Sequence, residues 1–513
     1  MKTVVWERVK GTVSALPVPF IGRDRPGGRP SLEEDEVEQA LRQVVGDTPD
    51  VEQPLLQSTN AESASEPQDT DQVPEADGMP PSEKTSKGDG ASMAASVFSL
   101  TNTIIGAGIM ALPRAVATLG VVPGALLILL VYILTFITIN VLSSASEYSG
   151  RWTFGELIHY FFGRTGSWFL RLFIFINNAG LLITYTIMLG DVLVGKPPDY
   201  NGLLTNLTDI HEGDVWYLDR RFVVAVVVVV FLFPLAAQRS LKSLAWAGAM
   251  GLVLASGFAM LVVVLVVLAG IQGRIQGVSL WPNADLTGPS ALDQIRGVFS
   301  TLPVIALAYV CHYNVHPLMR ELKDFSARRW SIVLNWSLTF CTVVYVIIGV
   351  GLYLVFLDST ESDVLLNFSS GSLEDIVGSL AADIITYCVL LGYALNLIFT
   401  YPMINWGLRE VIAEVAVGRP TLGNAAWVGI TAVIVVAAYA VAIAVPNIWP
   451  VMTITGATAA VAIGWIFPAC IMLRTSGGRC SSVKRLGACL LILLGLLTAV
   501  VAVHSTIEDL IHQ

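Results

Sequence analysis

The sequence predicts an all-α integral membrane protein with eleven transmembrane helices, of which helices 1 and 6 are broken. The composition, eleven long apolar stretches and interruptions in two of them predict this class. The chain has 513 residues, of which 54% are hydrophobic and only 14% are charged. Soluble globular domains carry about 25% charged residues, so this composition indicates a chain that lies mainly in a bilayer.

Residues 1–90 differ from the rest and are rich in Pro, Gly, Ser, Asp and Glu. They hold 9 Lys/Arg against 18 Asp/Glu, whereas the remainder holds 21 against 22. Such a segment cannot bury enough apolar surface to offset its ordering entropy. We expect 1–90 to be a disordered, acidic, cytosolic tail, either a solvated extension or a binding segment for a cytosolic partner. We expect 91–513 to be the transmembrane domain.

About twenty apolar residues cross the hydrocarbon core of a bilayer. Two successive units of five helices insert in opposite senses, because five is odd, so eleven spans fit an inverted repeat of five plus five helices and one extra. The expected spans lie near 94–118, 121–146, 168–194, 222–238, 243–270, 296–318, 331–356, 378–402, 424–445, 450–474 and 486–506.

The distribution of basic residues predicts the orientation. Lys and Arg gather in cytosolic loops, and a cytosolic N-terminus gives these loops fifteen Lys/Arg against five on the other side. The sequons at Asn206 and Asn367 then fall in non-cytosolic loops, which makes both residues glycosylation candidates. We therefore expect a multi-pass protein whose N-terminus is cytosolic.

Helix 1 contains Gly106-Ala107-Gly108 at membrane depth. Glycine weakens a helix where lipid cannot satisfy freed backbone groups, so we expect an unwound segment that lines a cavity. Its amides suit an α-carboxylate, and its freed carbonyls, such as that of Ile105, suit an ammonium group or a sodium ion. The alternative is close packing of small residues between helices. Helix 6 is expected to be interrupted between Pro303 and Pro317.

Two further polar residues are candidates for a cation site. Asn102 lies about one turn before the break in helix 1, and Thr400 lies near the cytosolic end of helix 8. Both carry side-chain oxygens, which hard cations prefer as ligands. The alternatives are a bond from Asn102 to a neighbouring helix and a bond from Thr400 to its own i−4 carbonyl.

Two of the ionisable residues within the expected spans are candidates for a functional role. His312, in helix 6, is a candidate for proton coupling or pH sensing, with a hydrogen-bonded interface role as the alternative. Arg114, in helix 1, is a candidate for gating or for an ion pair with Asp191 or Asp383.

Four stretches resemble the amino acid/auxin permease family in the same order along the chain. The likeness is greatest to the sodium-coupled neutral amino acid transporters and their plant and fungal vacuolar relatives, and it covers roughly residues 91–506. It implies a LeuT-type bundle and transport of amino acids by alternating access. The sodium-site asparagine and threonine of the sodium-coupled members map onto Asn102 and Thr400. The matching stretches are 99–113, 311–317, 363–368 and 454–469.

These features together predict a secondary active amino acid transporter and not an enzyme. The substrate carboxylate is expected at Gly106, Ala107 and Gly108, and its amino group near the backbone of Val304 and Leu307. No cofactor or nucleic-acid partner is expected, and the coupling ion is sodium or a proton. A sensor of the same fold that signals through its tail is the alternative. The expected location is an endomembrane (vacuole or lysosome) or the plasma membrane, in contact with lipid.

Overall fold

The computed structural model describes residues 90–197, 200–208, 215–239, 245–417, 423–475 and 482–512. The chain divides into two units, residues 1–74 and 75–513, and every described residue belongs to the second unit. The expected disordered tail, apart from Gly90, therefore lies outside the described residues.

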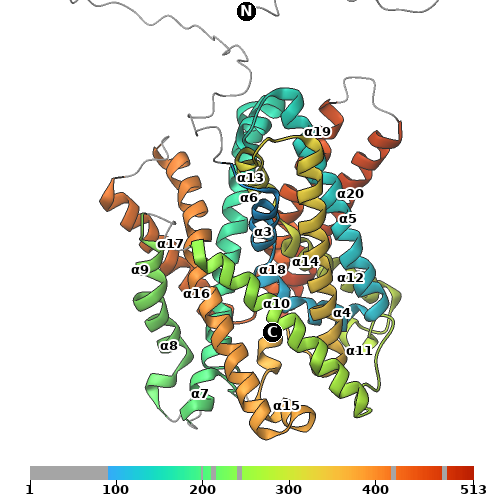
Figure 1. The fold of residues 1–513 in the computed structure, drawn as a ribbon, viewed down its shortest axis with the longest axis vertical. Coiled ribbons are helices and arrows are strands. Elements are labelled where there is room, and N and C mark those ends of the chain that lie inside the picture. Colours follow the sequence, from blue (N-terminus) through green and yellow to red (C-terminus); the bar gives the residue numbers. More distant parts are fainter. Residues whose placement is uncertain are drawn as a thin grey trace, which may run out of the picture. The chain divides into compact units, whose positions relative to one another are not determined.

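Every regular element in the described ranges is helical, which confirms the predicted all-α class. Figure 1 shows the helices packed side by side. The first elements are α3 (Met93–Ile104), η1 (Ala107–Ala111), α4 (Leu112–Leu119), α5 (Val121–Ser149), α6 (Phe154–Leu193), α7 (Leu203–Thr208), η2 (Trp216–Leu218), α8 (Arg220–Val227), η3 (Val228–Leu232), α9 (Phe233–Ala236) and α10 (Ala245–Ile271). The next are α11 (Ala284–Thr287), α12 (Ala291–Tyr309), α13 (His312–Glu321), α14 (Ala327–Phe356), η5 (Leu357–Ser359), η6 (Val364–Asn367), α15 (Ser370–Val377) and α16 (Ser379–Val417). The last are α17 (Asn424–Ala444), α18 (Ile448–Thr455), η7 (Gly456–Ala460), η8 (Ala462–Ile466), α19 (Phe467–Thr475) and α20 (Ser482–His512).

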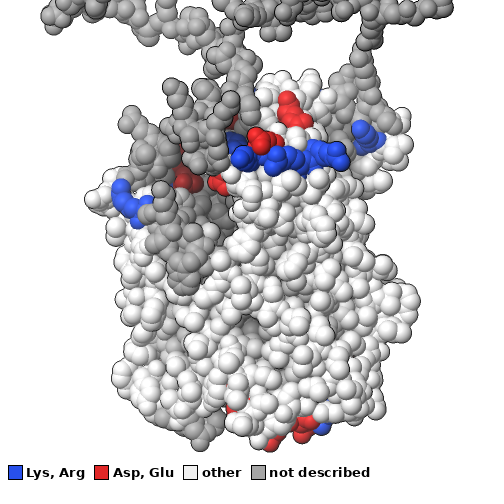
Figure 2. Space-filling view, viewed as in Figure 1, with Lys and Arg blue, Asp and Glu red and all other residues white. Residues whose placement is uncertain are grey.

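Long apolar helices dominate this unit. Among the described residues, nine helices are long and apolar enough to cross a membrane, or ten if the bent pair formed by α3 and α4 is one span. The continuous run α8–η3–α9 is shorter, at seventeen residues. Figure 2 shows a broad belt without charged side chains between two charged ends on the visible face, as expected for a chain that crosses a bilayer.

Helix boundaries fall where the sequence supplies caps or glycine. A capping box starts α12, because the Ser290 hydroxyl accepts from the Asp293 amide while the Asp293 carboxylate accepts from the Ser290 amide. Gly120 separates α4 from α5 with a φ of 78°, a conformation that costs glycine little. Gly163 has a φ of 63° inside α6, so this element consists of two helices joined at a kink.

The helix-1 segment is interrupted at its glycine pair. The helix α3 ends at Ile104, Ile105 is extended with a ψ of 106°, and Gly106 is extended with φ −144° and ψ −157°. The chain then continues through η1 into α4, and the two halves are bent by 54°. Pro113 occupies the first turn of α4, where its missing N–H leaves no bond unmade.

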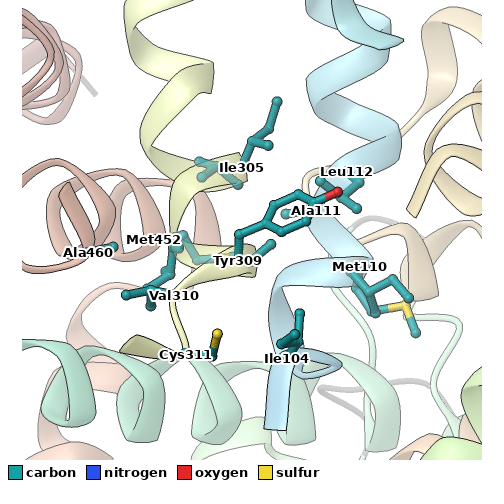
Figure 3. Close-up of a cluster of buried hydrophobic side chains, with 14 of the residues drawn as sticks. Ile104, Met110, Ala111, Leu112, Ile305, Tyr309, Val310, Cys311, Met452 and Ala460 are labelled. Carbon is teal, nitrogen blue, oxygen red and sulfur yellow. The ribbon is translucent and has the colours of Figure 1, made fainter. Parts of the chain in front are cut away.

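The helix-6 segment is also interrupted, beyond Pro303. That proline stays inside α12, and the helix ends at Tyr309. Val310 is extended, and α13 begins at His312 with Pro317 in its interior. Figure 3 shows Tyr309 reaching across from α12 to Ala111 and Leu112 of the helix-1 segment. The two interruptions therefore lie on neighbouring segments.

The two interrupted segments pack most closely at Gly108. A Cβ placed on Gly108 would lie 2.7 Å from Cβ and 2.8 Å from Cα of Ala308. Since real Cβ atoms do not approach other heavy atoms so closely, only glycine allows this crossing. The alternative of close packing between small residues therefore describes Gly108. Gly106 differs, because the nearest atom to a Cβ there is the Tyr185 hydroxyl oxygen at 3.5 Å.

We expect Gly108→Ala to destabilise the protein by about 1–3 kcal/mol, because the added methyl group overpacks the crossing with α12. Thermal or denaturant unfolding of the purified protein measures this change. Gly429→Ala is the matched control, since a Cβ there meets nothing within 4 Å. Equal stability of the two variants would contradict the close approach at Gly108.

Candidate functional site

The helix α14 supplies hydrogen-bond donors along α3. Ser337 Oγ donates to the Val97 carbonyl at 3.1 Å, and Cys341 Sγ lies 3.8 Å from the Thr101 carbonyl oxygen. One turn further, the Tyr345 hydroxyl lies 2.8 Å from the Ile104 carbonyl oxygen. Positions i, i+4 and i+8 share one helix face, so this polar row follows α3 to its end.

Tyr345 also reaches the second interruption. Its hydroxyl oxygen lies 2.8 Å from the Ala308 carbonyl oxygen as well as 2.8 Å from that of Ile104. The last carbonyls of a helix have no intrahelical partner, so one buried hydroxyl serves the ends of both α3 and α12. Next to it, the Tyr309 hydroxyl donates to Thr342 Oγ1 at 2.8 Å. The sequence analysis did not find Tyr345, although the spacing of Ser337, Cys341 and Tyr345 was a usable signal.

A cavity of about 350 Å³ lies beside Gly106, between the helix-1 segment, α10 and α16. Its lining is mainly apolar and includes no Asp, Glu, Lys or Arg among the described residues. Val304 and Leu307, the predicted contacts for the substrate amino group, are buried in α12 and do not line it. The lining residues are Ile105, Gly106, Ile109, Met110, Gly251, Val253, Leu254, Ala255, Gly257, Phe258, Leu261, Cys388, Val389, Gly392, Tyr393 and Asn396.

Amide side chains from two helices converge at one edge of this cavity. A Cβ on Gly251 of α10 would lie 2.6 Å from Asn396 Oδ1 and 3.6 Å from Asn102 Oδ1. Thr400 follows Asn396 by one turn on the same face of α16. In the described part of the chain, neither the two amides nor the Thr400 hydroxyl has a hydrogen-bond partner. The structure thus adds Asn396, at i−4 from Thr400, to the predicted cation candidates.

The cavity region offers oxygen ligands and no cluster of metal-binding side chains. Within the described ranges, His, Cys, Asp and Glu nowhere gather in a group of three that could hold a metal ion. The available donors at the cavity edge are neutral oxygens of amides, a hydroxyl and backbone carbonyls, which suit a hard monovalent cation better than a transition metal.

His312 lies in the packed core and not at the cavity. Its side chain is 1% exposed, and Nε2 lies 2.8 Å from Thr138 Oγ1 of α5. One turn later, His316 Nε2 lies 2.9 Å from Ser146 Oγ of the same helix. Nδ1 of each ring has no partner in the described part of the chain. Both histidines therefore join α13 to α5 through one nitrogen and leave the other buried and unbonded.

Arg114 binds a backbone carbonyl instead of an acid. Its Nη1 donates to the Thr360 carbonyl at 2.8 Å. The predicted pairing with Asp191 is wrong, because Asp191 is paired with Lys196 at 3.3 Å and with Arg220. Among the described residues, Asp383 has no ion pair with Arg114 either. Arg114 thus fixes the segment that follows α14.

The two glycosylation candidates differ in their side-chain bonds. Asn367 donates through Nδ2 to the Ser359 carbonyl and accepts through Oδ1 from the Glu361 amide, both at 2.8 Å. Asn206 Nδ2 is buried. A glycan is attached through this nitrogen, so glycosylation of either residue stays a prediction for the chain before it folds.

The helices long and apolar enough to cross a bilayer define a multi-pass membrane protein, and its helix-1 segment is interrupted beside a cavity. The fold is similar to that of a manganese transporter from Eremococcus coleocola, with a TM-score of 0.52 at 12% identity over 81% of this chain and 86% of that one. This likeness shows the fold alone.

The sequence comparisons identify the family. Residues 89–508 match the model of the transmembrane amino acid transporter protein family, and the chain belongs to this family. It is 32% identical to amino acid transporter AVT6E of Arabidopsis thaliana over 83% of this chain and 85% of that protein. It is 24% identical to the putative sodium-coupled neutral amino acid transporter 11 of Danio rerio over 81% and 86%. The resemblance seen in the sequence is thereby confirmed, and these relatives are named as transporters.

We expect Tyr345→Phe to lower the free energy of unfolding by about 1–3 kcal/mol, because it removes the one hydroxyl proton that two buried carbonyls share. Denaturant unfolding of the purified protein measures the loss. Tyr132→Phe is the control, since the partly exposed Tyr132 hydroxyl makes only long contacts of 3.3 and 3.5 Å. A loss no larger than that of the control would show that the Tyr345 hydroxyl does not hold the two interruptions.

Proposed function

We propose that this chain is a secondary active transporter that moves amino acids by alternating access around the cavity beside Gly106. One observation carries the proposal. The extended backbone at Gly106 lines a cavity whose edge holds Asn102 and Asn396, two amides without protein partners among the described residues. Partner-free polar groups at an unwound helix are what a bound ion or zwitterion requires.

The substrate backbone fits at the start of η1. The amides of Gly106, Ala107 and Gly108 come before or within its first turn, where N–H groups lack intrahelical acceptors and attract a carboxylate. The substrate side chain then extends along Leu254 and Phe258, which supports uncharged substrates. Val304 and Leu307 reach the substrate only in a conformation in which α12 has moved.

A coupling cation fits one turn earlier. The Ile105 carbonyl, Asn102, Asn396 and Thr400 supply neutral oxygens from α16 and from the end of α3, a set suited to sodium. If the coupling ion is a proton, this cation site is not needed. His312 is then the candidate for proton binding, since its buried Nδ1 is unbonded among the described residues.

The topology in this proposal is the eleven-span, LeuT-type inverted repeat. Counting α3–α4 as one span and adding α8–η3–α9 to the longer helices gives eleven crossings. Lys and Arg gather on one end of the face in Figure 2, which supports a cytosolic position for that end. The N-terminus is then cytosolic, and the membrane is vacuolar, lysosomal or plasma membrane. A cytosolic partner of residues 1–90 stays a prediction.

We expect Gly106→Leu to abolish amino acid uptake without preventing insertion, because the side chain fills the space beside the unwound backbone. The measurement is uptake of labelled amino acids into proteoliposomes, with membrane insertion checked by protease protection. Gly429→Ala, far from the cavity, should retain wild-type flux. Normal flux in Gly106→Leu would contradict the substrate site.

We expect Thr400→Ala and Asn396→Ala to raise the sodium concentration for half-maximal uptake at least tenfold, because each removes an oxygen ligand. Uptake is measured under a sodium gradient and then under a proton gradient alone. Accumulation that is driven only by protons and unchanged in both variants would remove the cation site. It would leave the transport function intact.

A further inference from the structure

The segment 357–369, between α14 and α15, packs against one wall of the cavity. Its apolar side chains are buried, with Val364 and Phe368 both 0% exposed. The Phe368 ring packs on Phe258 with centroids 5.4 Å apart, and Phe258 lines the cavity. The segment is also held by the bond from Arg114 to the Thr360 carbonyl. Opening this segment would therefore remove the packing of Phe368 from the cavity wall.

A buried carboxyl group lies in the middle of this segment. Asp363 is 0% exposed, and its Oδ1 accepts from the Leu365 amide at 3.1 Å. Its Oδ2 is buried and has no hydrogen-bond partner in the described part of the chain. An ionised carboxylate in such a place lacks both water and a donor for one oxygen, which is costly. A protonated carboxyl group carries only the smaller cost of an unpaired hydroxyl.

The nearby cations are already bound to another acid. Asp191 of α6 is ion-paired with Lys196 and with Arg220 of α8. Arg220 also donates to the carbonyls of Ile187 and Gly195, at 2.9 Å each. The ion pairs of the described residues include none from Lys196 or Arg220 to Asp363. Asp363 therefore lies next to an ion-paired cluster and, among the described residues, has no cation in direct contact.

The titratable groups that face Asp363 come from each element packed around it. They are Asp191 and Lys196 from the end of α6 and its loop, Arg220 from α8 and Tyr393 from α16. Tyr393 lines the cavity, and its buried hydroxyl also has no partner among the described residues. Arg114 and Glu361 interact at the other end of the segment. The carboxyl group thus lies between the cluster and a cavity-lining residue.

We propose that Asp363 is a proton-binding site, and that the segment 357–369 closes over the cavity with uptake of one proton from the adjoining solution. The proton converts the Asp363 carboxylate to a neutral carboxyl group as the side chain becomes buried. When the segment opens, the carboxyl group releases the proton to water. That this closure gates amino acid entry rests on the transport function proposed above.

The sign of the pH dependence follows from linkage. Burial, with a smaller contribution from the Asp191 charge, raises the pKa of Asp363 from 3.8 to about 8 in the closed segment. In an open, hydrated segment the pKa returns towards its ordinary value of about 4. The closed state is fully favoured below that ordinary pKa. The ratio of closed to open segments falls about tenfold for each unit that the pH rises towards 8. Above pH 8 this ratio changes no further.

Hydrogen–deuterium exchange of the purified full-length protein tests the proton site directly. We compare wild type, Asp363→Asn and Glu374→Gln between pH 5.5 and 8.5, with rates corrected for intrinsic exchange. Asn keeps an oxygen for the Leu365 amide but cannot ionise, and Glu374 is an exposed acid that follows the same segment. In the wild type and in Glu374→Gln, the segment 357–369 should open about tenfold more often for each unit that the pH rises, up to pH 8. Asp363→Asn should show no such dependence.

Two outcomes overturn the proposal. One is wild-type exchange in 357–369 that does not change with pH, a result that needs no variant to fold. The other is an Asp363→Asn profile that follows the wild type.

Transport provides a separate readout. In counterflow without any gradient, the wild-type KM on this side should rise as the pH is lowered from 8 to 6, because the open state that admits substrate becomes rarer, and that of Asp363→Asn should stay constant. A protein that transports nothing but shows the exchange effect would refute the transport function and keep the proton site. Transport with pH-independent exchange would refute the proton site alone.

Discussion

One buried hydroxyl, that of Tyr345, holds together the two places where membrane helices stop. It lies 2.8 Å from the last carbonyl of α3 and 2.8 Å from a carbonyl in the last turn of α12. In hydrocarbon an unpaired carbonyl costs several kcal/mol, so these helices could not end here without a donor from a third helix. The extended backbone at Gly106, the cavity beside it and the Gly108–Ala308 crossing all depend on these endings.

The same constraint distinguishes the carbonyl groups that end α3 from the amide groups that begin η1. The donors of α14 occupy carbonyls of α3, whereas no side chain among the described residues accepts from the amides at the start of η1. The interrupted segment therefore bonds part of its carbonyls, but not these amides, to the described scaffold. The two glycines divide accordingly, because Gly106 lines the cavity and Gly108 packs against α12.

Local signals made part of this architecture predictable from the sequence. The helical class, the interruption at Gly106 and the family followed from hydropathy, glycine and motif order. Pairings between distant segments did not. One alternative for Arg114 was an ion pair with an acid, because the sequence shows charges. Arg114 bonds instead to the backbone carbonyl of Thr360, a group that every residue carries. Asn396 was missed because its importance arises only from what α10 and α3 bring beside it. Tyr345 had a local signal in its spacing from Ser337 and Cys341, but its acceptors on α3 and α12 come from distant segments.

The Arg114–Thr360 bond has a consequence for how the two positions vary in evolution. Its acceptor is a main-chain atom, so position 360 can change its side chain across generations while the attachment persists. An alanine scan through 357–369 would miss this attachment entirely, and covariation between positions 114 and 360 would be absent even among descendants that all retain it. Of the two side chains, only that of Arg114 takes part in the contact. A side-chain substitution therefore removes the contact at position 114 and not at position 360.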